Sequence, residues 1–158
     1  MSSEKSERKQ VVSFEALLAQ LTELKKYIDA LQNQLTQVQE ELNEIKSSIN
    51  ALTEFKNEGV SEFLAPADRR GYVLIKASPH YVDRVITHVG LEYYAELSLD
   101  KAFEVLINRE KEYKDIADEL QKELVKALNH YERLENLVNS IIAQAQQART
   151  QQVKSTGS

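Results

Sequence analysis

A hydrophobic stripe in the first third of the chain, with members alternately three and four residues apart, constrains the fold more than any other feature. The stripe consists of Phe14, Leu17, Leu21, Leu24, Ile28, Leu31, Leu35, Val38, Leu42, Ile45, Ile49 and Leu52. The residues between its members are mostly Glu, Lys, Gln, Asn and Ser. An apolar repeat of about 3.5 residues, held over several heptads, requires a partner helix along its whole length. The pattern predicts a coiled-coil helix over residues 11–58.

A second stripe with the same period runs through the last third of the chain. It consists of Leu99, Phe103, Leu106, Glu110, Tyr113, Ala117, Leu120, Leu124, Ala127, Tyr131, Leu134, Val138, Ile141, Ala145 and Ala148. Glu110 is its only charged member, and we expect this side chain to reach the solvent edge of the seam. Ser98 is a residue type favoured at helix N-caps, and Asp100 in the first turn complements the helix dipole. The second helix is therefore predicted over residues 98–148.

The simplest partner for each helix is the other, folded back as an antiparallel hairpin. With Leu52 opposite Leu99, the numbers of paired residues sum to about 151, and Phe14 lies opposite Leu137. The paired length is then about 60 Å at a rise of 1.5 Å per residue. A parallel homodimer of each helix would also satisfy the heptads. The hairpin is favoured because an insert of about 45 residues returns the chain without strain.

The insert, residues 60–97, holds nearly all the turn-forming residues. Of the 4 glycines and 2 prolines, all but Gly157 lie between Gly59 and Gly90. Strand-favouring residues separate them, which predicts two β-hairpins. The expected strands are residues 62–65, 72–77, 83–89 and 92–97, with a loop over 66–71 and a type II′ turn at Gly90 and Leu91.

The second hairpin is expected to be apolar on both faces. This turn would place Ile86, Tyr93, Ala95 and Leu97 on one face and Val85, Thr87, Val89 and Tyr94 on the other. Isolated hairpins cannot bury two apolar faces or pair their open edges. We therefore expect an obligate oligomer in which other chains complete the β-structure. The expected subunit interface consists of Tyr72, Leu74, Ile75, Val85, Ile86, Val89, Tyr93 and Tyr94.

The free end of the expected helix hairpin carries more apolar residues than one seam needs. These residues are Val11, Val12, Phe14, Leu17, Leu18, Leu137, Val138, Ile141 and Ile142. A wide apolar surface that water reaches is usually an interaction site. Alternatively, these side chains close the tip of the hairpin against one another. Beyond them, the polar segments 1–10 and 149–158 are expected to be disordered.

Composition and motifs argue against enzymatic chemistry. The chain has no nucleotide-binding glycine motif and no cysteine, and His80, His88 and His130 lack metal-ligand spacing. We therefore expect no cofactor, no metal and no catalytic residue. The net charge of −5 disfavours nucleic-acid binding. No apolar run reaches membrane-spanning length and no signal sequence is evident, so no membrane association and a cytoplasmic location are expected.

Two segments of the insert resemble the α-class subunits of the prefoldin family. LAPADRRGYVLIKA (64–77) is similar to the family's leucine-x-proline, loop and tyrosine-valine strand. DRVITHVGLEYYAELSLDKA (83–102) is similar to its valine-glycine-x-x-tyrosine hairpin, which runs into the second helix. The resemblance covers about residues 12–148, and two hairpins favour the α class over the single-hairpin β class. The chain departs from the family at residues 68–70 and at Glu92, where glycine or other small residues are common.

The resemblance implies a mainly α fold with a small β insert, in which two β-hairpins join the helices of a long antiparallel coiled coil. Residues 1–158 would then form a single subunit. It implies a hexamer of two α and four β subunits, whose hairpins form a β-barrel hub. It also implies an ATP-independent chaperone that holds unfolded protein clients at the coiled-coil tips and passes them to a group II chaperonin. The alternative function is a structural spacer or adaptor in a hetero-oligomer, which would need no apolar tip.

Overall fold

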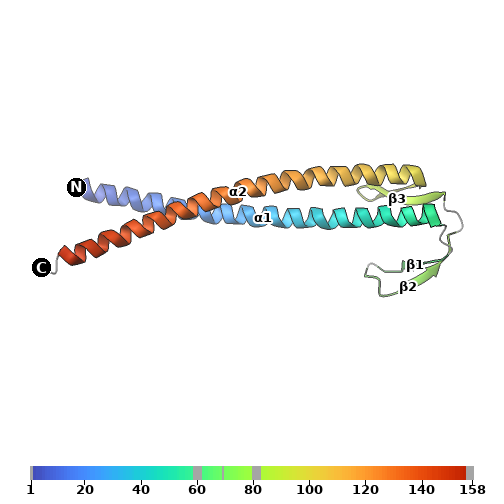
Figure 1. Ribbon diagram of the computed structural model, residues 1–158, viewed down its shortest axis with the longest axis horizontal. Coiled ribbons are helices and arrows are strands. Elements are labelled where there is room, and N and C mark those ends of the chain that lie inside the picture. The colour runs from blue at the N-terminus through green and yellow to red at the C-terminus, as the bar shows by residue number, and fades with distance from the viewer. Residues whose placement is uncertain (1, 59–61, 69, 80–82, 156–158) are drawn as a thin grey trace. The chain divides into compact units, whose positions relative to one another are not determined.

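In a computed structural model of the chain, the backbone is described for residues 2–58, 62–68, 70–79 and 83–155, and side chains are described from residue 14 onward. These residues form helix α1 (Ser2–Glu58), strands β1 (Phe63–Pro66), β2 (Leu74–Ala77), β3 (Arg84–Gly90) and β4 (Tyr93–Ser98), and helix α2 (Leu99–Ser155) (Figure 1). β1 pairs with β2 and β3 pairs with β4, both antiparallel. The predicted order of helix, two hairpins and helix is confirmed.

The chain divides into two compact units, and the first combines Met1–Thr36 with Asp118–Ser158. Its core is formed by Ile28 and Leu31 of α1 with Leu124 and Ala127 of α2. Leu24, Leu35, Leu120 and Tyr131 are partly buried against this core. The Tyr27 hydroxyl donates a hydrogen bond of 2.8 Å to Glu123 Oε2. These contacts lie close to the register predicted for an antiparallel hairpin, so within this unit the two helices partner each other.

The second unit, Gln37–Ala117, contains both hairpins and the adjoining helical segments. At the junction, Lys56 Nζ lies 2.9 Å from Asp100 Oδ1 and 5.6 Å from the centre of the Phe103 ring. The Phe55 and Phe63 rings meet edge to face, with centroids 5.5 Å apart. These contacts connect the end of α1 to the start of α2 and to β1.

The predicted seams coincide closely with the buried faces of the helices. Every member of the first stripe is buried or half-buried, as is the second stripe from Leu99 to Ile141. Ala145 and Ala148, which the pattern also placed in the seam, are exposed. Conversely, Ala102 is 0% exposed although it lies outside the heptad positions. Glu110 is half-buried, and its Oε1 lies 2.7 Å from Lys114 Nζ. This ion pair holds the Glu110 carboxylate at the edge of the seam.

The helices are longer than predicted at the outer ends. α1 is helical from Ser2, and α2 continues to Ser155, so most of the two segments expected to be disordered is helical. Neither segment contains proline, and the only glycine there is Gly157. Glu, Lys, Gln and Arg, which are frequent in them, favour helix. At the inner end, the Lys101 amide donates to the Ser98 hydroxyl at 3.3 Å, which confirms the predicted N-cap.

The turn between β3 and β4 lies one residue later than predicted. Gly90 pairs with Tyr93, which leaves Leu91 and Glu92 as the turn, and the ladder is irregular between His88 and Gly90. Leu91 has a φ of 50° and Gly90 a φ of 153°. Moving the turn by one residue changes each cross-strand partner by two positions, which preserves the faces, but the irregularity between His88 and Gly90 takes one position back. The net shift between the strands is one residue, which moves side chains to the opposite face.

The predicted composition of the hairpin faces is therefore wrong. Val85 is paired with Leu97 and Thr87 with Ala95, and these four side chains are buried or half-buried on one face. Ile86, which was expected beside Ala95 and Leu97, lies on the opposite face and is 76% exposed.

Candidate functional site

The hairpins expose most of the residues predicted to form a subunit interface. Tyr72, Leu74, Ile75, Ile86, Val89, Tyr93 and Tyr94 are all exposed. The exception is Val85, which is half-buried on the inner face of β3 and packs within the chain's own second unit. We call the seven exposed side chains the hairpin surface. Exposing so many large apolar side chains to water is unfavourable. Such an exposed patch is typical of a surface that binds another molecule.

Sequence reasoning missed three further apolar residues on the hairpins. Leu64 and Val73 are each 57% exposed, and Leu91 is 88% exposed at the turn of the second hairpin. Val73 stands between Tyr72 and Leu74, which had been identified, so the strand pattern contained its signal. Leu64 lies on β1, from which no interface residue had been predicted. Leu91 was expected only to form the turn, and a leucine at a turn position gave no indication that its side chain would be exposed.

The loop between β1 and β2 is organised by the Asp68 carboxylate. Asp68 Oδ2 accepts a hydrogen bond of 2.9 Å from the Val73 amide, and Oδ1 accepts bonds from the amides of Arg70 and Tyr72 at 2.9 and 3.3 Å. The Val73 bond is the main cause of a lowered Asp68 pKa, which slight desolvation opposes. Gly71 in this loop has a φ of 69°, a backbone conformation that favours glycine. The loop therefore forms its turn through a side-chain acceptor at residue 68.

The candidate binding residues at the outer helix ends fall into three groups. Leu18, Leu137 and Ile142 are 41%, 46% and 40% exposed, and we call these three the end surface. Phe14, Leu17 and Ile141 are half-buried seam residues, and Val138 is only 5% exposed. The side chains of Val11 and Val12 lie outside the described part of the chain.

Exposed apolar residues on α2 are not confined to its outer end. Ile107, Ile116, Val125 and Leu128 are also exposed. These four positions depart from the heptad pattern and were predicted neither in the seam nor at the end. They provide an internal comparison for any function assigned to the end surface.

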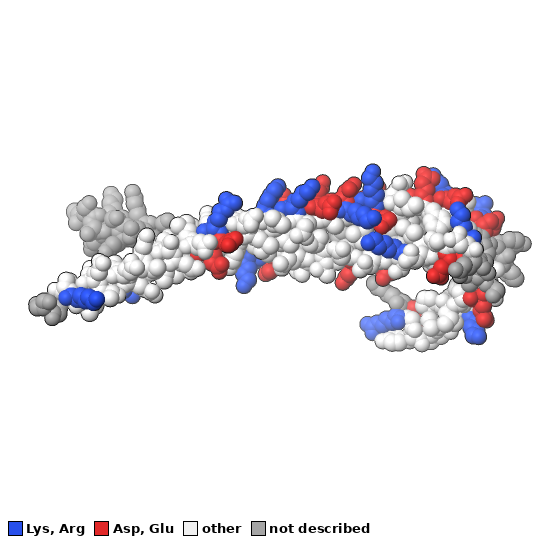
Figure 2. All heavy atoms as spheres, viewed as in Figure 1, with Lys and Arg blue, Asp and Glu red and all other residues white. Residues whose placement is uncertain are grey.

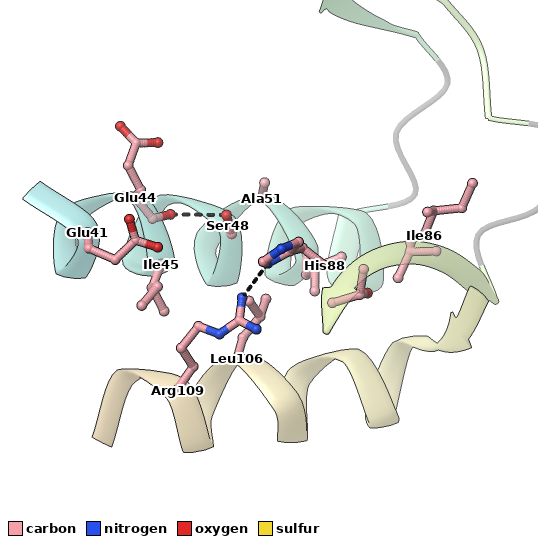
Figure 3. A pocket seen from close by; sticks show the side chains of 12 residues that line it. Glu41, Glu44, Ile45, Ser48, Ala51, Ile86, His88, Leu106 and Arg109 are labelled. Carbon is pink, nitrogen blue, oxygen red and sulfur yellow. Dashed lines mark hydrogen bonds between the residues drawn. The ribbon is translucent and has the colours of Figure 1, made fainter. Parts of the chain in front are cut away.

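An open groove of about 390 Å³ lies within the second unit (Figure 3). It is lined by Glu41, Glu44, Ile45, Ser48, Ala51 and Leu52 of α1, Val85–His88 of β3, and Leu106 and Arg109 of α2. At its centre, Arg109 Nη1 donates to His88 Nδ1 at 3.1 Å. Among the described residues, no cluster of His, Cys, Asp or Glu is arranged to hold a metal ion.

Charged side chains of both signs alternate along the face of the molecule shown in Figure 2. Four of the described ion pairs that illustrate this mixing are Lys26–Glu23, Lys76–Glu62, Arg84–Glu96 and Lys101–Glu104. All four are solvent-exposed, and such pairs contribute little stability. Within the described residues, no helix has the length and apolar character needed to span a membrane.

Comparison with known proteins assigns the chain to a family. The family described as "Prefoldin subunit" matches residues 24–148. A prefoldin subunit alpha from Sulfurisphaera tokodaii is 41% identical over 146 residues, covering 92% of this chain and 95% of the relative. One from Saccharolobus solfataricus is 38% identical over 141 residues, with coverages of 89% and 94%. Another, from Metallosphaera sedula, is 37% identical over 142 residues, with coverages of 90% and 96%.

A solved structure supports the same fold. The chain matches the filamentous PFD of Methanocaldococcus jannaschii, determined by cryo-electron microscopy, with a TM-score of 0.57 and 19% identity. The match covers 80% of this chain and 95% of the other. Together with the matched residues and the high coverage of the curated relatives, this places the chain in the prefoldin family.

Proposed function

We propose that this chain is the α-class subunit of a hexameric prefoldin, with a second α copy and four β-class subunits as partners. The observation that carries the proposal is the hairpin surface, whose seven large aliphatic and aromatic side chains are exposed in the single chain. Tyr93 and Tyr94 are 69% and 68% exposed, and Ile86 is 76% exposed. Neighbouring subunits that cover these side chains would also pair the free strand edges, whose backbone groups otherwise invite aggregation.

We further propose that the assembled complex is an ATP-independent holdase, which works in the cytoplasm and passes its clients to a group II chaperonin. In this proposal, clients contact the end surface, Leu18, Leu137 and Ile142. Each such contact is small and has no sequence preference. Several subunits holding one unfolded chain would bind it tightly through effective concentration. Binding unfolded in preference to folded protein suppresses aggregation by mass action, without an energy source.

The assembly half of the proposal is tested by mixing the chain with a β-class prefoldin subunit and measuring the mass of the product. We expect a complex of two α and four β chains. Replacing Ile86 and Tyr93 with serine should abolish it. Replacing Ile116 and Val125, which are exposed on α2, with serine is the matched control and should leave it intact. If the variant with Ile86→Ser and Tyr93→Ser assembles at the same protein concentration as the wild type, the role assigned to the hairpin surface is wrong.

The holdase half is tested with the assembled complex and a chemically unfolded protein, by following aggregation through light scattering. Replacing Leu18, Leu137 and Ile142 with serine should leave assembly intact and remove most of the suppression. Val125→Ser with Leu128→Ser is the control, because these side chains are similarly exposed but lie away from the end. If the control variant loses as much suppression as the end variant, clients do not bind selectively at the end surface. Full suppression by the end variant would instead favour the spacer or adaptor function.

A further inference from the structure

The ring of His88 is held between two groups whose hydrogen-bonding roles are fixed. On one side, His88 Nε2 lies 2.6 Å from the carbonyl oxygen of Leu91. On the other, His88 Nδ1 lies 3.1 Å from Arg109 Nη1, as Figure 3 shows. A carbonyl oxygen can only accept a hydrogen bond, and a guanidinium can only donate one. The two contacts therefore require a hydrogen on Nε2 and a bare lone pair on Nδ1.

These contacts link three elements of the second unit. His88 belongs to β3, Leu91 forms the turn into β4, and Arg109 belongs to α2. Leu91 has a φ of 50°, a conformation that is unfavourable for a residue with a side chain, and the bond to its carbonyl helps to hold it. Across the hairpin, the His88 ring meets the Tyr94 ring edge to face, with centroids 5.2 Å apart. His88 thus contacts both the turn and an exposed tyrosine of the hairpin surface.

Arg109 has an unusual partner for a half-buried cation. Among the described residues it forms no ion pair, and its hydrogen bond goes to an imidazole rather than a carboxylate. An imidazole that gains a second proton becomes a donor at both nitrogens and carries a positive charge. Its Nδ1–H would then face the N–H groups of Arg109, so this hydrogen bond would be replaced by repulsion.

Two further charged groups line the groove from α1, Glu41 and Glu44. Figure 3 shows the Glu44 side chain directed away from His88 and Arg109. Tyr94 is the titratable group that meets the His88 ring from β4.

We propose that His88 and Arg109 position the β3–β4 hairpin on α2 through the neutral, Nε2-protonated imidazole, and that protonation of this ring releases the hairpin. The consequence for assembly rests on the proposed function, because the hairpin carries Tyr93 and Tyr94 of the proposed interface. The positioning itself is a property of the single chain and is tested on it. It makes the geometry of the hairpin surface sensitive to mild acid.

The first test is the state of the ring in the full-length wild-type chain. Nitrogen-15 chemical shifts of the imidazole distinguish the two neutral forms, and His130, which is exposed on α2, serves as the reference. At neutral pH we expect His88 to carry its proton on Nε2 alone, while His130 exchanges between both forms. A proton on His88 Nδ1, or a mixture like that of His130, would overturn the proposal without any variant being made.

The second test uses hydrogen exchange of the β3 and β4 amides. His88→Phe and Arg109→Met should each speed this exchange on the order of tenfold, the usual effect of losing one or two hydrogen bonds. His130→Phe and Arg133→Met are the matched controls and should stay within about twofold of the wild type. Equal exchange in His88→Phe and the wild type would contradict the proposal. Circular dichroism confirms that the helices of each variant are intact.

The third test separates protonation from mere loss of packing. His88→Gln keeps one donor and one acceptor but cannot take up a proton in this pH range. Across the pH range in which imidazoles titrate in proteins, the protection factors of the hairpin amides, which correct exchange rates for their intrinsic pH dependence, should fall with acid in the wild type and stay constant in His88→Gln. An acid response that persists in His88→Gln would assign the effect to another group and overturn the proposal. If all three tests succeed but no variant or wild-type chain assembles with a β-class subunit, the proposed function fails and the positioning stands.

Discussion

The hydroxyl of Tyr27 on α1 donates a 2.8 Å hydrogen bond to the carboxylate of Glu123 on α2, across 96 residues of sequence. The bond sits beside the core of Ile28, Leu31, Leu124 and Ala127. Sliding one helix by a heptad would move these partners about 10 Å apart while still offering apolar residues to the seam. A heptad pattern alone therefore leaves the register open, and Tyr27 with Glu123 provides a contact that only one register allows.

We predict that Tyr27→Phe and Glu123→Gln each lower the melting temperature slightly, and that the double variant loses less than the sum of the two. The reason is that Tyr27→Phe removes the hydrogen bond and Glu123→Gln weakens it by removing the charge of the acceptor, so their effects overlap. Thermal unfolding followed by circular dichroism at 222 nm, the usual helix signal, measures all three. Glu119→Gln, a nearby exposed glutamate, is the control and should combine additively with Tyr27→Phe.

The same bond predicts a response to alkali. The hydrogen bond to Glu123 raises the Tyr27 pKa, with smaller contributions from desolvation and from the charge of Glu123. A pKa that is raised in the folded state adds stability below the unfolded value, near 10, and this stability is lost as pH rises through the folded value. We therefore expect the difference in melting temperature between the wild type and Tyr27→Phe to shrink above about pH 10. A difference that stays constant to higher pH would show that the hydroxyl bond is not its source.

The seam was predictable because a coiled coil repeats a simple constraint. Each apolar residue at a three- or four-residue spacing must enter the partner helix, so Phe14 through Leu52 could be placed from spacing alone. The repeat stops being informative where the partner ends, and so Ala145 and Ala148 fit the pattern but are exposed. Ala102 shows the opposite failure, because its complete burial in the second unit is not a heptad requirement.

We predict that Ala102→Leu lowers the free energy of unfolding by about 1–3 kcal/mol, because a fully buried methyl group has no room for a larger side chain. Urea unfolding monitored by circular dichroism measures the change. Ala148→Leu, at an exposed alanine near the other end of α2, is the matched control and should change the unfolding free energy by less than about 0.5 kcal/mol. An equal effect at both positions would contradict the burial of Ala102.

The hairpin faces could not be read correctly from the strand pattern, because they depend on an irregularity in the ladder as well as on the turn. Gly90 suggested a turn that begins with glycine, whereas the structure pairs Gly90 with Tyr93 and turns at Leu91 and Glu92. The turn alone would change the pairing by two residues and keep the faces, but the irregularity between His88 and Gly90 leaves a net shift of one residue, which reverses the assignment of Val85 and Ile86. At the outer ends of the helices, the sequence indicated more apolar residues than the seam needs. It did not show which of these side chains are buried, as that of Val138 is.

We predict that Leu91→Gly stabilises the second hairpin. Leu91 adopts a φ of 50°, and relieving that conformation recovers about 1–2 kcal/mol. The greater freedom of glycine in the unfolded chain costs about 0.5–1 kcal/mol, so the net effect is a modest gain. Hydrogen exchange of the β3 and β4 amides should slow accordingly. Leu91→Ala removes most of the same side chain but keeps the unfavourable conformation, and it should not slow exchange; equal slowing in both variants would rule out backbone strain as the cause.

The loop at Asp68 shows how one side-chain acceptor can organise a turn. Its carboxylate accepts hydrogen bonds from the amides of Val73, Arg70 and Tyr72, and the Val73 bond contributes most to lowering its pKa. A lowered pKa in the folded state adds stability above the unfolded value, near 3.9, and this stability is lost as pH falls through the folded value. The loop should therefore hold its order through mild acid and lose it only at lower pH.

We accordingly predict that Asp68→Ala speeds exchange of the Val73 amide at every pH above about 4, because that amide loses its acceptor. Asp68→Asn keeps one acceptor oxygen but no charge, so it should give an intermediate rate and remove the acid dependence. Asp83→Asn, at an exposed aspartate of the same insert, is the control and should leave the Val73 rate unchanged. If the Val73 amide in Asp68→Asn still loses protection as the pH falls toward 3, a different titratable group controls this loop. The Asp68 carboxylate cannot be the cause, because this variant lacks it.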